Sequence, residues 1–93
     1  MRIPKKLKIG GHVFTVHLVS EKAGYGINTE NEQGACNFGS CEIYLDKNQA
    51  QTQLEATFLH EILHAINGEL DHELLTSLAE QLYQVLHDNR LLK

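Results

Sequence analysis

Residues 50–67 read AQTQLEATFLHEILHAIN, a run without Gly or Pro. Apolar side chains recur in it three and four positions apart, the spacing of one face of an α-helix. A face this wide predicts a helix that the rest of the fold largely encloses. We expect the helix to end at Gly68 in a left-handed conformation. The predicted buried face contains Leu54, Phe58, Ile62, Ala65 and Ile66, widened by Leu59 and Leu63.

A second helix is predicted over residues 72–87, with Asp71 as its N-cap. Only three or four residues link it to the first helix, so the two should form an antiparallel pair. Its apolar stripe is predicted to be core rather than a surface for a partner. The stripe contains Leu74, Leu75, Leu78, Ala79, Leu82, Val85 and Leu86.

The first half of the chain is predicted to be mostly strand. Two extended segments flank Gly10-Gly11, a dipeptide typical of a two-residue hairpin turn. In the second segment Phe14, Val16 and Leu18 should share one face. Strands are also expected at 35–38 and 41–46, after a polar loop at 20–34 with at most a short strand near 25–27. The prediction is one α+β domain, residues 1–93, with a small antiparallel sheet of three to four strands packed on two helices.

His60-Glu61-Ile62-Leu63-His64 forms the pattern H-E-x-x-H within the first predicted helix. Residues four apart stand one above the other on a helix, so both imidazoles can reach one ion. Zn²⁺ accepts neutral imidazole nitrogen at about 2.0–2.1 Å. Glu61 lies about 100° further round, where it can contact a water on the metal instead. The pattern predicts His60 and His64 as zinc ligands and Glu61 as a general base.

A catalytic zinc site needs a third protein ligand and an open position. Glu73 is the favoured third ligand because it lies just across the tight turn, in the first turn of the second helix. Glu80, seven residues later, is on nearly the same side and is the second choice. The remaining candidates near the turn are His72, Glu69 and Asp71.

The segment TFLHEILHAI resembles the extended zincin signature, and Glu73 on the next helix makes the chain similar to the gluzincins. The short spacing of eight residues between His64 and Glu73 resembles that of the very small minigluzincins. From IPKKLKIGG through CEIYLDKN to LAEQLYQVLHDN the chain also resembles small, mostly phage- or prophage-encoded proteins of the metallopeptidase type. Metzincins place Gly three and His six positions after the second histidine. Here Gly68 and His72 lie four and eight positions after His64, which disfavours His72 as a ligand.

The resemblance implies a zincin-like fold with an active-site helix and a glutamate helix, and a zinc-dependent metallopeptidase acting on a peptide or protein. It offers Tyr83 as a candidate for stabilising the oxyanion, and the strand at 41–46 as the one that aligns an extended substrate. Two alternatives remain open. One is a non-catalytic, zinc-stabilised phage module that binds another protein. The other is an interaction module without metal.

Composition and charge limit which kinds of partner the protein can bind and indicate the cellular compartment in which it works. A net charge of −4 argues against a general nucleic-acid binder. No apolar run has the length of a membrane span, and the first residues lack the features of a secretory signal. We therefore expect a cytoplasmic protein, in the bacterial host if it is phage-encoded. Cys36 and Cys41 are then expected to be reduced thiols.

Overall fold

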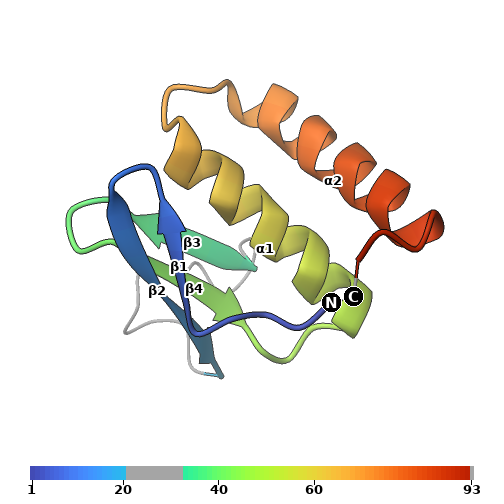
Figure 1. Cartoon of the computed structure of the whole chain (residues 1–93), viewed down its shortest axis with the longest axis horizontal. Helices are drawn as coiled ribbons and strands as arrows, with labels where there is room; N and C mark the ends of the chain where they lie inside the picture. The colour runs from blue at the N-terminus through green and yellow to red at the C-terminus, as the bar shows by residue number, and fades with distance from the viewer. Residues whose placement is uncertain (21–32, 93) are drawn as a thin grey trace.

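The computed structural model describes residues 1–20 and 33–92. Its elements form three layers, with the sheet beneath helix α1 and helix α2 on the far side of α1 (Figure 1). This arrangement confirms an α+β fold with two helices. The predicted strand near 25–27 lies outside the described residues. The elements are β1 (Lys6–Ile9), β2 (His12–Val19), β3 (Gly34–Asn37), β4 (Glu42–Asp46), α1 (Gln51–Ile66) and α2 (His72–Asp88).

The sheet has four strands in the order β1-β2-β4-β3. β1 and β2 form the predicted hairpin, in which Ile9 pairs with His12 and Gly10 has a φ of 61°. The prediction of an entirely antiparallel sheet was wrong, because β2 and β4 pair in parallel, with Val16 opposite Ile43. β4 inserts between β2 and β3, so strands that follow one another along the chain are not all neighbours.

The core lies between the sheet and α1, and it explains the central position of β4. Ile43 and Leu45 have no exposed surface, so this strand needs cover on the helix side and pairing on both edges. β3, with the short sequence GACN, takes the edge position. The core residues are Phe14, Val16, Ile43, Leu45, Leu54 and Phe58, with Ile62 and Ala65 packed against them. Ile66, predicted to lie on the buried face of its helix, is instead 62% exposed. Leu18, predicted to share a face with Phe14 and Val16, is 49% exposed whereas those two are buried.

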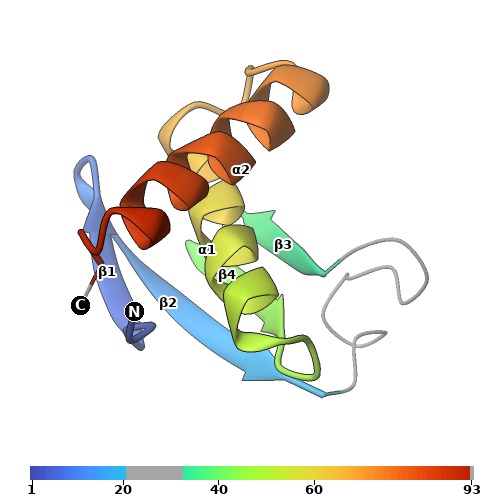
Figure 2. The same ribbon diagram turned by 90° about the vertical axis from the view of Figure 1, so that its right-hand side faces the viewer.

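Helix α2 packs mainly against α1, as an antiparallel partner (Figure 2). A helix with one packing partner buries a narrow face, and here that face holds Leu75, Ala79 and Tyr83. The prediction that the whole apolar stripe is core was therefore wrong. Its exposed members are Leu74, Leu78, Leu82 and Val85. Within residues 1–20 and 33–92, neither helix is long and apolar enough to cross a bilayer.

At the turn between the helices, the predicted N-cap of α2 is confirmed, whereas the predicted C-terminal end of α1 was wrong. The Asp71 carboxylate accepts a hydrogen bond of 3.1 Å from the Leu74 amide, as predicted for an N-cap. α1 does not end on a left-handed Gly68. Asn67 ends it in an extended conformation, with a φ of −149°. Gly68 instead leaves space for the Phe38 ring, since a Cβ at position 68 would lie 2.9 Å from Phe38 Cζ.

Candidate metal centre

A cleft of about 760 Å³ lies between β3, α1 and α2. On α1 the lining residues recur three and four positions apart, so they form one face of the helix. The opposite wall comes from the first half of α2, and β3 with the β3–β4 turn supplies the third side. The α1 residues are Gln53, Ala56, Thr57, His60, Glu61 and His64; those of α2 are His72, Thr76, Ala79 and Glu80; the third side includes Gly34, Ala35, Cys36 and Phe38.

Three imidazoles converge in this cleft. His60 and His64, one turn apart on α1, have ring centroids 4.9 Å apart, as the motif predicts. His72, at the start of α2, lies 5.3 Å from His60 and 5.9 Å from His64 between ring centroids. One nitrogen from each ring can be chosen so that all three lie within 4.8 Å of one another. The first turn of α2 therefore completes a three-histidine group.

The environment favours the neutral form of the His60 and His64 imidazoles. Burial, together with the proximity of His64 and His72, lowers the pKa of His60 to about 4. Burial and the proximity of His72 also lower the pKa of His64 below its ordinary value. A neutral imidazole keeps a lone pair for a metal, whereas three protonated rings at this distance would repel one another. Both shifts thus favour the form of histidine that binds zinc.

Glu61 is 5% exposed and borders the cleft beside the two α1 histidines. Gly34 of β3 allows the strand to approach this carboxylate closely. A Cβ at position 34 would lie 3.2 Å from Glu61 Cγ and 2.8 Å from Thr57 Cγ2. Cys36 of the same strand also borders the cleft, and burial followed by the negative charge of Glu61 raises its thiol pKa to about 11. Cys36 is therefore a neutral thiol at pH 7, and both it and Cys41 are free of disulfides in the structure.

We expect Gly34→Ala to destabilise the fold by about 1–3 kcal/mol, the usual cost of adding a methyl group to a tightly packed site. The new methyl would also meet the Tyr44 carbonyl oxygen at 3.1 Å, and backbone cannot move aside as a side-chain tip can. Thermal unfolding measures the effect. Gly11→Ala is the matched control, because a Cβ there meets nothing within 4 Å. Equal melting temperatures for the two variants would contradict the close approach of β3 to α1.

The sequence ranked Glu73 first and Glu80 second as the third zinc ligand, and the positions of these residues in the structure do not follow that ranking. Glu73 is exposed and is neither in the three-histidine group nor on the cleft wall, whereas Glu80 borders the cleft. His72, which the sequence disfavoured, supplies the third imidazole. Helical spacing could have indicated it, since His72, Thr76 and Ala79 share the face of α2 that borders the cleft. Glu73 as a ligand stays a prediction, and the geometry offers His72 beside it.

Tyr83 does not border the cleft, so its assignment as an oxyanion stabiliser gains no support from the structure. It is buried, and its hydroxyl donates a 2.9 Å hydrogen bond to Glu55 Oε1. Burial and this bond raise the pKa of Tyr83 to about 12. Burial alone would raise the pKa of Glu55, but hydrogen bonds from Gln51 and Tyr83, together with the N-terminal ammonium 3.5 Å away, outweigh it and lower that pKa. Tyr83 thus ties α2 to a buried carboxylate of α1.

The folded chain therefore places three imidazoles and a buried carboxylate in one cleft, beside an edge strand. No protein-family model, curated protein or solved structure matches this chain.

Proposed function

We propose that this chain is a zinc-dependent metallopeptidase. The observation that carries the proposal is the convergence of His60, His64 and His72 beside Glu61, in a cleft large enough to admit a segment of peptide. The similarity of the motif to that of the gluzincins supports the same function. A catalytic zinc site with three protein ligands and an adjacent carboxylate is a known arrangement for hydrolysis.

The donor set fits zinc. Three histidine ligands with a fourth position left open are one of the recognised catalytic zinc sets. Ligand nitrogens at 2.0–2.1 Å from a tetrahedral ion lie about 3.4 Å from one another. The nitrogens here are within 4.8 Å, so side-chain rotations that close at most about 1.4 Å (4.8 minus 3.4) would form the site. We propose His60, His64 and His72 as the ligands, with Glu73 as the competing third ligand from the sequence.

The chemistry assigned to the protein rests on Glu61. When bound, zinc would polarise a scissile carbonyl and lower the pKa of water toward neutral. Glu61 would accept the proton from the attacking water and then donate it to the leaving amine. Because Glu61 follows His60 by one residue, its side chain lies about 100° round the helix from that of His60. It is therefore next to the two ligand histidines without being a ligand itself. Close packing against Gly34 holds the carboxylate in place during both transfers.

An extended substrate would pair with β3. The sequence pointed to the strand at 41–46, but that expectation was wrong because β4 has β2 on one side and β3 on the other. β3 is an edge strand of the described sheet, and its residues Gly34, Ala35 and Cys36 border the cleft. A peptide added at an edge forms backbone hydrogen bonds that set its register whatever its side chains. This placement would bring a peptide bond to the histidines.

The test is the digestion of an unbiased peptide library by the zinc-loaded protein. Cleavage that stops when zinc is chelated and returns when zinc is restored supports the proposal. Zinc-loaded protein that cleaves no peptide, yet melts at a higher temperature than the metal-free form, supports the zinc-stabilised interaction module instead. A melting temperature unaffected by zinc or by a chelator supports the module without metal.

A further inference from the structure

A continuous apolar stripe runs along one flank of α2, about 100° round the helix from the face that packs on α1. Leu74, Leu78, Leu82 and Val85 are 52%, 47%, 44% and 46% exposed. Their spacings of four, four and three residues place them within an arc of about 80° at 100° per residue. Single exposed leucines are ordinary on protein surfaces, whereas a row of four along one helix marks an interaction surface.

The stripe is exposed because α2 is the outermost layer. Its packing face meets α1, and the sheet lies on the opposite side of α1 (Figure 2). Cover for the stripe must therefore come from outside the part of the chain that the structure describes. Exposed apolar residues also stand close to each end of the helix. Ile66 ends α1 just before the turn and is 62% exposed, and Leu91 follows α2 and is 61% exposed.

We propose that the stripe binds a second copy of this chain, with the two α2 helices packed antiparallel about a twofold axis. A twofold interface uses the same patch on both subunits and closes after two copies. The midpoint of the stripe lies near position 80, so Leu78 would face Leu82 of the second copy. Leu74 of one copy would then lie near Val85 of the other, and each Ile66 would approach the opposite Leu91.

The charges at the two ends of α2 favour this pairing over a parallel one. Glu69, Asp71 and Glu73 cluster at the N-terminal end and are exposed, while Arg90 is exposed at the C-terminal end. An antiparallel pair brings each Arg90 toward the acidic end of the other copy, whereas a parallel pair would bring two acidic ends together. These are surface charges, so their attraction is screened by salt.

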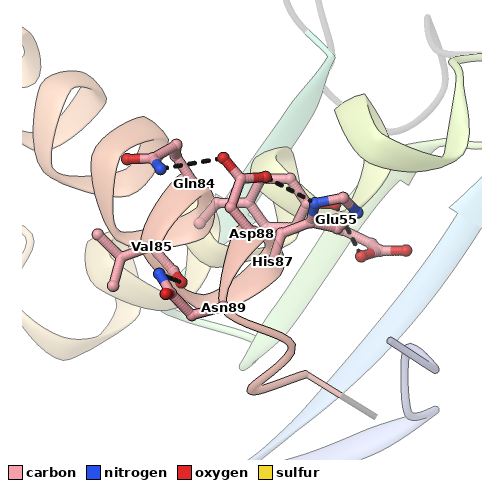
Figure 3. A network of polar contacts seen from close by, with 7 residues as sticks. Glu55, Gln84, Val85, His87, Asp88 and Asn89 are labelled. Atoms are coloured by element: carbon pink, nitrogen blue, oxygen red, sulfur yellow. Dashed lines mark hydrogen bonds and ion pairs between the residues drawn. The ribbon is translucent and has the colours of Figure 1, made fainter.

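Asp88, the acid at the C-terminal end of α2, makes its contacts within its own helix. Gln84 Nε2 donates a 3.0 Å hydrogen bond to Asp88 Oδ2, and His87 Nδ1 lies 3.2 Å from Asp88 Oδ1 (Figure 3). These contacts lower the pKa of Asp88. The Asp88 carboxylate stays charged and exposed, so the C-terminal end of α2 carries one acid and one base. The N-terminal end, with three exposed acids, is the more negative of the two, so antiparallel pairing still keeps two such ends apart.

The interface would be small and would leave the cleft open. α2 has 17 residues and is about 25 Å long, which limits the contact to the lower range of specific interfaces. We therefore expect a dimer with a dissociation constant in the micromolar range, about 10–100 µM. At 100° per residue the stripe lies on the side of α2 away from His72, Thr76 and Glu80. Dimer formation is thus independent of the proposed peptidase activity.

Sedimentation equilibrium from about 5 µM to 1 mM tests the proposal, because that range spans the expected dissociation constant. Wild-type protein should change from monomer to dimer with increasing concentration. Leu78→Asn and Leu82→Asn each remove two central contacts per dimer, so each should weaken association about 100-fold. Val13→Asn is the matched control, since Val13 is equally exposed, at 51%, on β2. Wild type that stays monomeric at 1 mM, or leucine variants that dimerise normally, would overturn the proposal.

Charge variants test the antiparallel arrangement without touching the stripe. Arg90→Glu should weaken the dimer about tenfold at low salt, and less at 0.5 M salt. Combining it with Glu69→Lys exchanges the charges of that one pair and should restore part of the lost association. If Arg90→Glu leaves the dimer unchanged, or the double variant remains as weak as the single one, the antiparallel pairing is wrong. Melting curves within about 2 °C of wild type verify that each variant is folded.

Discussion

Glu61→Gln is expected to abolish peptide cleavage while zinc stays bound. Gln has nearly the same shape as Glu but cannot accept the proton from water at neutral pH. Removing a general base costs about 10²–10⁴-fold in rate, so kcat should fall by that factor. The side chain is not one of the three imidazoles that converge, so zinc affinity should change little. Rate measurements on a peptide cleaved by the wild type, together with metal analysis, provide both quantities.

The matched control is Glu42→Gln, which makes the same replacement of a carboxylate by an amide on the other face of the sheet. Glu42 lies 2.8 Å from His17 Nε2, on the side of β4 opposite the buried Ile43. Cleavage by this variant should equal that of the wild type. Equal rates for Glu61→Gln and wild type would rule out Glu61 as the base. If Glu61→Gln lost zinc as well, the carboxylate would be acting on the metal rather than on the proton.

His72→Ala is expected to weaken zinc binding by at least about 10³-fold, more than the 10–100-fold typical of losing a residue that only supports a ligand. It removes one of three imidazole donors that lie within 4.8 Å of one another. Glu73→Ala should change zinc affinity less than threefold, because Glu73 is exposed and outside that group. Competition with a fluorescent chelator measures both dissociation constants at the same pH.

The two variants replace adjacent residues in the first turn of α2, so each controls for damage to that turn. Asp71, the cap of the helix, is unchanged in both. If Glu73→Ala lost the metal and His72→Ala kept it, the glutamate assignment from the sequence would stand and the three-histidine site would be wrong. If neither variant affected zinc, the third ligand would lie elsewhere, and Glu80 on the cleft wall would be examined next.

Local patterns predicted the elements of this fold well, because they depend on neighbouring residues. The glycine pair at 10–11 set the hairpin, and Asp71 begins α2 where its side chain can cap it. The order of the sheet was not available from such patterns. The order depends on which of β3 and β4 occupies the central position, and that is decided by how much apolar surface each strand buries against distant segments of the chain.

The same distinction separates the two parts of the site. His60 and His64 are related by the pitch of one helix, so their sequence spacing fixed their proximity. The third donor depends on how α2 is rotated about its own axis against α1. His72 and Glu73 are adjacent but point about 100° apart, so the rotation decides which one enters the cleft. The burial of Tyr83 and the exposure of Leu78 follow from that rotation too.

The most direct test of the account is X-ray absorption at the zinc edge on the zinc-loaded protein, with the metal content determined on the same sample. The account predicts one zinc per chain, with three imidazole nitrogens at 2.0–2.1 Å and one oxygen ligand. Protein that retains no zinc after loading, or a spectrum with two imidazoles or fewer, would contradict it.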